Sequence, residues 1–375
     1  MEAYLDNAAT TPMDHEVLEA MTPYMTGTFG NPSSIHSHGR KAKAAVEVAR
    51  KQVAELLNTS PSEIFFTSGG TEADNMAISC TVRSHNIKHI ITSQLEHHAV
   101  LHTVQMFERQ GVKVSYVNFD AQGAVDFNHL ETLLQENERS LVSLMHGNNE
   151  IGNLLDLEKT GELCSEYDAI LHSDTVQTIG HYPHDLSKLK AHCVVGSAHK
   201  FHGPKGIGLL YLDAGHKIDP FIHGGAQERN MRGGTENVHG IIGLARALEI
   251  ACSGMEEHTS HIQKIKASMI SQLKSQIPDV QFNGLSEIPD RSLYTVLNVS
   301  LPPSDNSDMM LFNLDIKGIS ASGGSACSSG TDVGSHVLRA MKADPNRGAV
   351  RFSFSKYTTE QEISYAVSVL AALYR

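Results

Sequence analysis

Cysteine is scarce in this chain, and its few cysteines lie far apart. Five occur among 375 residues. An odd number with no closely spaced pair argues against a disulfide framework and against a zinc-binding motif. We therefore expect reduced thiols in a cytoplasmic protein. Four of the cysteines stand in apolar or helical contexts and are predicted to lie in the core: Cys80, Cys164, Cys193 and Cys252.

The sequence also lacks long apolar runs and an excess of basic residues. No run approaches the ~20 apolar residues that a membrane span requires. The N-terminus shows no basic segment followed by an apolar one, so no signal peptide is expected. Lys and Arg number 30 against 42 Asp and Glu, which gives a net charge of −12. Because an acidic chain binds nucleic acid and anionic membranes poorly, we expect neither as a partner.

Short apolar runs alternate with helical stretches over residues 63–212. Helical stretches such as 99–110 and 157–167 separate several of the runs. β-rich runs separated by helices predict an α/β fold with a mostly parallel sheet that is buried on both faces. The runs are 64–66, 89–92, 112–117, 141–145, 169–172, 193–195 and 207–212.

Beyond residue 238 the pattern changes, and it predicts a second, smaller α+β domain. The last helix is expected to begin near Thr359, where Thr359 and Glu362 have the spacing of a capping box. We expect a large domain over 15–252 and a small domain formed by 1–14 and 253–375. The predicted elements are a long helical stretch 238–276, a strand 294–301, a helix 308–317, a Gly/Ser loop 320–330 and a strand 350–355.

Lys200 and Asp174 each follow a predicted strand. Lys200 stands among small residues and before the Gly/Pro-rich segment 201–206. A lysine held in a partly desolvated cleft can form a Schiff base, whereas most single loop lysines are simply solvated. Asp174 closes the run 169–174, where a carboxylate is costly without a partner. It could pair with a pyridinium nitrogen or could cap a helix, and the local sequence leaves both interpretations open.

The segment 65–73 is an apolar strand that runs through Gly69 and Gly70 into a helical stretch. Such a turn points backbone N–H groups at an anion, with help from the helix dipole. It matches neither of the glycine-rich nucleotide motifs, so a phosphate monoester fits better than a nucleotide. The alternative is that this segment is an ordinary strand-to-helix turn that binds no ligand, because such turns have the same kind of sequence.

Cys327 is the exceptional cysteine, because it lies in the Gly/Ser-rich tract 322–330 without bulky apolar neighbours. Such a tract predicts an exposed, flexible loop. A lone thiol there is either incidental or a nucleophile that has to move.

The order of these motifs along the whole chain resembles the cysteine desulfurases of the NifS/IscS type. These belong to the class V branch of fold-type I pyridoxal-phosphate enzymes. The resemblance implies a large domain with a mostly parallel seven-stranded sheet, a smaller C-terminal domain and pyridoxal 5′-phosphate as cofactor. The motifs that carry it are 4–12, Thr67–Glu72, Glu96–His97, His146–Gly152, Asp174 with Gln177, His199–Lys200, Met231–Thr235 and Gly324–Cys327.

The resemblance implies a role for each residue near the cofactor ring. Lys200 would bind the cofactor covalently, Asp174 would pair with the pyridine nitrogen, and Gln177 would bond to the ring hydroxyl. His97 would stack on the ring and carry protons. Cys327 would take the sulfur from the substrate and hold it as a persulfide.

Further residues would hold the phosphate and the substrate. Asn149 and Arg351 would bind the substrate carboxylate, with Asn149 also at the cofactor, and a guanidinium suits bidentate carboxylate binding. Thr235 would reach the phosphate from a second subunit, which implies a homodimer. No metal is expected. The phosphate ligands within the same subunit would be Gly70, Thr71, Ser197 and His199.

The activity implied by the resemblance is removal of sulfur from L-cysteine, which yields L-alanine and a persulfide on Cys327. The sulfur would pass to an acceptor protein in iron–sulfur cluster, thio-cofactor or tRNA-thiolation pathways. The alternatives are selenocysteine lyase, which also uses a cysteine, or another class V aminotransferase, which needs no loop cysteine. A non-catalytic member should have lost Lys200, Asp174 or His97. IscS-like members carry a C-terminal segment that docks the iron–sulfur scaffold protein, whereas Arg375 directly follows the last predicted helix, so this partner is less favoured here.

Overall fold

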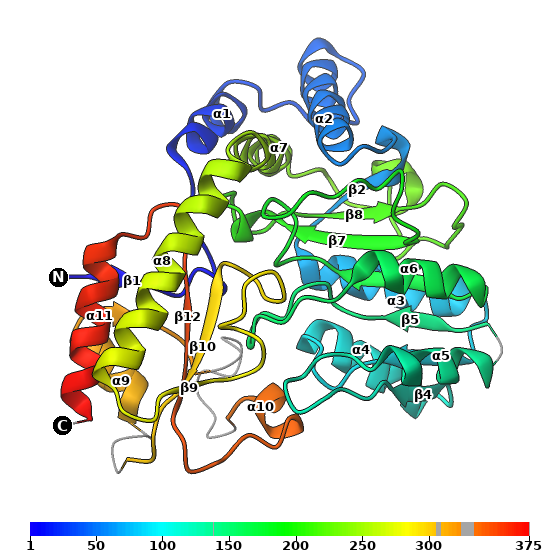
Figure 1. Ribbon diagram of the computed structural model, residues 1–375. Coiled ribbons are helices and arrows are strands. Elements are labelled where there is room, and N and C mark those ends of the chain that lie inside the picture. Colours follow the sequence, from blue (N-terminus) through cyan, green and yellow to red (C-terminus); the bar gives the residue numbers. More distant parts are fainter. Residues whose placement is uncertain (138, 305–308, 324–333, 375) are drawn as a thin grey trace.

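The computed structural model describes residues 1–374 except 138, 305–308 and 324–333. Its centre is a seven-stranded sheet with the strand order β2-β8-β7-β6-β5-β3-β4 (Figure 1). Each strand coincides with one of the apolar runs in the sequence, so the predicted sheet is confirmed. The strands are β2 (Ile64–Thr67), β3 (His89–Thr92), β4 (Lys113–Tyr116), β5 (Leu141–Ser143), β6 (Ile170–Asp174), β7 (Cys193–Ser197) and β8 (Gly208–Leu212).

The sheet is mostly parallel and buried on both faces. Strands β4, β3, β5, β6 and β7 run parallel, and β8 runs antiparallel to both β7 and β2. Successive residues point to opposite faces: Ile90 and Leu141 belong to one core cluster, and Ile91 and Val142 to another. Both faces are therefore apolar, as expected for parallel strands covered by helices.

Two sets of helices cover the sheet. On one face, α3 (Gly70–Ser84) and α4 (His98–Arg109) pack against the strands. On the other face, α5 (Phe127–Gln135) and α6 (Leu157–Glu166) pack together with three further helices. Those three are α1 (His15–Thr26), α2 (Ser37–Leu56) and α7 (Val238–Ser253).

A second core lies beside the large sheet. The antiparallel sheet β12-β10-β9 packs with the remaining long helices, and β1 pairs in parallel with β11. Both ends of the chain lie in this part of the molecule (Figure 1). The division into domains at 15–252 stays a prediction. The elements are β1 (Ala3–Tyr4), α8 (Met255–Gln276), β9 (Gln281–Phe282), β10 (Val296–Ser300), α9 (Met310–Ile316), β11 (Ile319–Ser320), α10 (His336–Ala340), β12 (Ala349–Ser353) and α11 (Glu360–Leu373).

The predicted helical stretch 238–276 consists of two helices, α7 and α8. Helices α7 and α8 meet at 73° around Gly254. A side chain at Gly254 would lie 2.5 Å from the His258 ring, so glycine allows this tight junction. Among the described residues, no single helix is long and apolar enough to cross a membrane; only this bent pair, taken together, passes such a test. The predicted capping box at the start of α11 is confirmed, with Thr359 and Glu362 bonded reciprocally.

Candidate active site

A cavity of about 190 Å³ lies at the carboxyl ends of β6 and β7. Ligands bind at this edge in open α/β sheets, because strand ends and loops converge there. Asp174 ends β6, Ser197 ends β7, and Lys200 follows in a short 3₁₀ turn. Ten predicted site residues line this one cavity: Gly70, Thr71, His97, Asn149, Asp174, Gln177, Ser197, His199, Lys200 and Arg351.

Lys200 is half-buried, and an N-terminal segment holds its side chain. Its Nζ donates hydrogen bonds to the carbonyl oxygens of Ala8 and Ala9, at 2.6 and 2.9 Å. The same segment is fixed by Thr11, whose N–H donates to the His199 carbonyl at 2.9 Å. The segment before α1 therefore positions the lysine from more than 180 residues away in sequence, and its two alanines line the cavity.

Asp174 is only 6% exposed, and its carboxylate caps a turn instead of a helix. Its Oδ1 accepts a hydrogen bond from the Val176 N–H at 2.9 Å. Burial raises the pKa of Asp174, while the nearby Lys200 opposes that shift. A buried carboxylate on a cavity wall fits a cationic ring nitrogen, because such a partner compensates the charge. Gln177 is held beside it, with Nε2 donating to the Ala8 carbonyl at 3.0 Å.

The sequence analysis missed Asp74, which lines the same cavity from α3. The pKa of Asp74 is raised well above its ordinary value, chiefly by burial and then by Asp174 and Glu96. His172 lies behind it, with Nε2 3.3 Å from Asp74 Oδ1 and Nδ1 2.9 Å from Ser143 Oγ. Local sequence gives little signal for it, because a single acid within a helix resembles a solvated residue, and only the structure shows Asp74 on the buried face beside Ala73.

Two histidines on the cavity wall are neutral at physiological pH. Burial, and secondarily Lys200, lowers the pKa of His97 to about 4. The same causes lower the pKa of His199 to about 4. His97 is the N-cap of α4, where its Nδ1 accepts a hydrogen bond from the Ala99 N–H at 3.1 Å, and His199 Nδ1 lies 3.1 Å from Thr10 Oγ1. A neutral imidazole can accept a proton, which suits His97 to proton transfer.

The N-terminus of α3 gives the cavity an anion-binding end. Gly70 and Thr71 form its first turn, where N–H groups lack intrahelical partners and the helix dipole is positive. A Cβ at Gly70 would lie 2.7 Å from Val176 Cγ2, so a side chain would intrude on this end of the cavity. Ser197 approaches from β7. This arrangement can bind a phosphate group.

Arg351 lies on β12 of the smaller sheet, and its side chain lines the cavity. It is 1% exposed and is therefore not a solvated surface charge. Its Nη1 donates to the Asn149 carbonyl at 2.8 Å, and its Nη2 donates to Asp6 Oδ1 at 2.7 Å. Among the described residues, its Nε has no hydrogen-bond partner. A buried guanidinium with a donor to spare at the cavity wall can bind a carboxylate.

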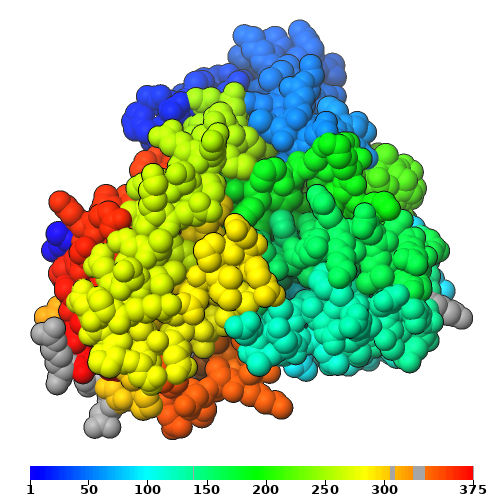
Figure 2. Space-filling view, viewed as in Figure 1, coloured from blue at the N-terminus to red at the C-terminus, as the bar shows by residue number. Residues whose placement is uncertain are grey.

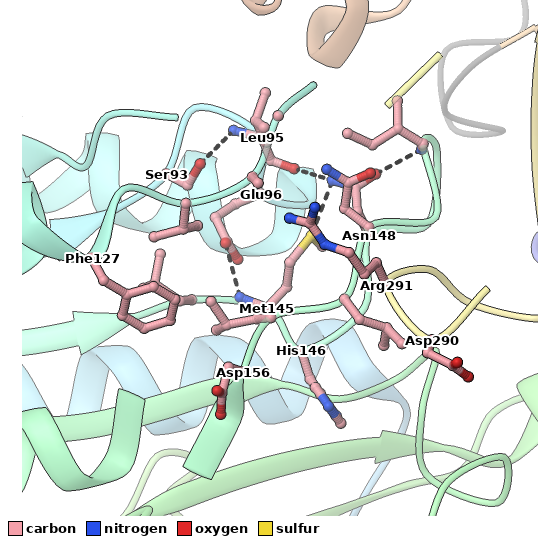
Figure 3. Close-up of a pocket in the computed structure, with 18 residues that line it drawn as sticks. Ser93, Leu95, Glu96, Phe127, Met145, His146, Asn148, Asp156, Asp290 and Arg291 are labelled. Carbon is pink, nitrogen blue, oxygen red and sulfur yellow. Dashed lines mark hydrogen bonds between the residues drawn. The ribbon is translucent and has the colours of Figure 1, made fainter. Parts of the chain in front are cut away.

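Hydrogen bonds in a neighbouring cavity of about 500 Å³ fix the loop that carries Asn149 (Figure 3). The Glu96 carboxylate accepts from the Met145 N–H at 2.9 Å, and Asn148 Nδ2 donates to the Leu95 carbonyl at 2.8 Å. Met145 lines both cavities. The segment 145–149 is thus a shared wall, which holds Asn149 toward the active-site cavity.

Two predicted residues are not placed at the cavity. Thr235 is exposed and lines a separate pocket, so within this chain it does not join the phosphate end; its role across a subunit interface stays a prediction. Cys327 lies outside the described residues. The described residues on each side of its loop are anchored near the cavity: the Arg351 N–H donates to the Ser322 carbonyl at 2.6 Å, and His336 Nε2 lies 2.9 Å from the Glu96 carbonyl.

The other four cysteines are poor candidates for a nucleophile. Cys80, Cys164 and Cys193 are buried as predicted, whereas Cys252 is half-buried. Burial raises the pKa of Cys80 to about 11 and that of Cys164 to about 12. It raises the pKa of Cys193 and Cys252 as well. Since the thiolate is the reactive form, these thiols are unreactive near pH 7.

Comparisons with known proteins identify the family of this chain. The aminotransferase class-V family model matches residues 3–365. The cysteine desulfurase IscS of Dictyoglomus turgidum is 42% identical, over 98% of this chain and 93% of its own. A solved NifS-like protein is 38% identical with a TM-score of 0.91 and covers 99% of both chains. SspA, solved in complex with cysteine, is 31% identical with a TM-score of 0.82, over 95% of this chain and 100% of its own. The chain therefore belongs to the class-V aminotransferase family and, within it, to the cysteine desulfurases of the NifS/IscS type.

Proposed function

We propose that this protein is a cysteine desulfurase that uses pyridoxal 5′-phosphate on Lys200 and takes sulfur from L-cysteine onto Cys327. The observation that carries the proposal is a single cavity that joins Lys200, the buried Asp174 and the buried Arg351. Relatives over nearly the full chain have this activity by name.

The residues around the cavity fit the cofactor. Asp174 offers a compensating charge to a ring nitrogen, and Gln177 offers an amide beside it. The first turn of α3, together with Ser197 and His199, would hold the phosphate. Asp74, whose Oδ1 lies 3.3 Å from His172 Nε2, adds a second buried carboxyl group to the cavity wall. When bound, the cofactor supplies an electron sink for charge that develops on the substrate α-carbon.

The protein groups bind the substrate and move its protons. Arg351 would use its Nε–H for the substrate carboxylate, with Asn149 beside it. Lys200 and neutral His97 face the same cavity and would carry protons to and from the substrate carbons. Asp174 would keep the ring nitrogen charged by placing a buried carboxylate next to it.

The sulfur step belongs to Cys327. Its thiolate would attack the substrate sulfur, so that an S–S bond forms while the bond between the substrate sulfur and Cβ breaks. The electron pair of the broken bond takes a proton, and alanine leaves. The sulfur stays on Cys327 as a persulfide for an acceptor protein.

The assembly and the cellular setting are parts of the proposal. Exposed Thr235, which does not line the cavity of its own chain, would complete the phosphate site of a second copy in a homodimer. The acceptor would be a protein of an iron–sulfur cluster, thio-cofactor or tRNA-thiolation pathway, in the cytoplasm.

The test measures products from L-cysteine with the reconstituted protein and a thiol reductant. Alanine and sulfide are expected in equal amounts, and Cys327→Ala should lower both rates by about a hundredfold or more. Cys252→Ala is the matched control and should retain the wild-type rates, because its half-buried thiol lies outside the site. Pyruvate in place of alanine, or full activity in Cys327→Ala, would contradict the proposal. Turnover of selenocysteine, measured in parallel, shows whether the protein prefers it to cysteine as a selenocysteine lyase would.

A further inference from the structure

A second lysine, Lys266, is buried and lines a different and larger cavity. This cavity of about 1,550 Å³ lies between α8 and the segment 287–294, and it shares no lining residue with the active-site cavity. In Figure 2 helix α8 (yellow-green) lies on the surface beside the yellow segment around residue 290. The apolar part of the wall includes Tyr182, Met255, Ile270 and Tyr294. The cavity is therefore reachable from outside and can hold an apolar ligand body.

Two hydrogen bonds hold the Lys266 amine in place. Its Nζ donates to the Leu293 carbonyl at 2.7 Å and to Ser292 Oγ at 3.1 Å. The Ser292 hydroxyl donates its hydrogen bond to the Ile288 carbonyl at 2.8 Å. Lys266 is therefore the donor in the contact with Ser292. Two N–H groups of Lys266 thus donate hydrogen bonds, and no described residue accepts a third. A neutral amine satisfies this arrangement and keeps its lone pair.

No counter-charge stabilises an ammonium at this position. Lys266 is 7% exposed and forms no ion pair with any described carboxylate. Of the charged residues on the cavity wall, Lys274 and Glu287 pair with each other, and Glu256 and Asp290 are exposed. Burial alone lowers the pKa of Lys266 to about 7. A substantial share of the amine is therefore neutral at physiological pH.

We propose that this cavity is a second carbonyl-binding site, in which the Lys266 amine condenses with an aldehyde or ketone that has an apolar body. A desolvated lysine in an apolar pocket is suited to such attack. The nitrogen forms a bond to the carbonyl carbon, and the carbonyl oxygen leaves as water with the two amine hydrogens. When solvent protonates the imine nitrogen, its single N–H can donate a hydrogen bond to the Leu293 carbonyl. The hydrogen bond to Ser292 Oγ is then lost.

Reductive trapping tests this site directly. The holoenzyme is incubated at pH 7 with hexanal and cyanoborohydride, and peptide mass spectrometry measures the hexyl adduct on each lysine. Lys264 is the matched control, because it lies two residues away on α8 and is exposed. An ordinary lysine has a pKa of about 10.4, so we expect Lys266 to be alkylated about tenfold faster than Lys264 or more.

Two outcomes decide the proposal. Preferential hexyl adduct on Lys266 supports it, and alkylation of Lys266 at a rate equal to or below that of Lys264 overturns it. Both outcomes are read in the wild-type protein, so the result does not depend on whether a Lys266 variant folds. Trapping also fixes pyridoxal phosphate on Lys200 with a different mass, so the two lysines report separately on this inference and on the proposed desulfurase.

Discussion

Two lysines of this protein, the half-buried Lys200 and the buried Lys266, stand in different electrostatic surroundings. Lys200 faces a small cavity with buried carboxyl groups on its wall, among them Asp174 and Asp74. Lys266 faces a large cavity with a mostly apolar wall and forms no ion pair with a described carboxylate. The comparison teaches that burial without a carboxylate lowers the pKa of an amine, whereas the carboxylate of Asp174 would compensate the charge of the proposed cofactor ring.

Lys200→Ala should have the largest effect, because it removes the amine that would carry both the cofactor and protons. We expect alanine formation to fall by about a thousandfold or more. Initial rates with saturating cysteine and cofactor measure it. Lys264→Ala, which changes an exposed lysine on α8, should leave the rate unchanged. Comparable losses in both variants would show that position 200 is not special.

Asp174→Asn makes the surroundings of Lys200 more like those of Lys266, since it removes charge with little change in shape. We expect turnover to fall by about a hundredfold, the range typical of a lost electrostatic stabiliser. The absorbance of the bound cofactor reports separately whether the site is still occupied. If the Asp174→Asn variant keeps wild-type turnover with full cofactor occupancy, the charge of Asp174 is not what distinguishes the surroundings of Lys200.

The smallest effect concerns stability. The pKa of Lys266 is lowered to about 7, so between pH 7 and the ordinary lysine pKa the unfolded chain binds more protons than the folded one. Stability attributable to Lys266 therefore rises with pH in this window. The unfolding free energy of wild type relative to Lys266→Met should increase by about 2 kcal/mol from pH 7 to pH 9.

Urea unfolding of both proteins at the two pH values measures this difference. Lys264→Met serves as the control and should show no such trend, since its side chain is exposed. A constant difference between wild type and Lys266→Met would mean that Lys266 keeps its proton in the folded state, which would remove the contrast with Lys200.

Much of the fold could be predicted from the sequence, because buried parallel strands leave a strong pattern. Runs such as 141–145 and 193–195 are apolar without alternation, and each became a strand of the central sheet. The bend at Gly254 was missed, because both flanking stretches have helical patterns and only packing against different partners separates them. Helix α7 packs on α1 and α2, while α8 packs on α11.

The site was predictable where residues follow strands or glycines, as Lys200 and Asp174 do. Asp74 was missed, because a single acid within a helix resembles a solvated residue until the tertiary structure places it at the cavity. Lys266 has the same character, since Gln263 and Lys264 beside it make α8 look exposed. Such residues depend on contacts between distant segments, and local sequence carries little of that information.

The central claim, that sulfur from cysteine is carried by Cys327, is tested most directly by mass spectrometry. The reconstituted protein is given one equivalent of L-cysteine without reductant, and its cysteine-containing peptides are compared before and after. We predict one extra sulfur atom on the Cys327 peptide and none on those of Cys80, Cys164, Cys193 and Cys252. Alanine formed in full while the Cys327 peptide keeps its original mass would contradict the account.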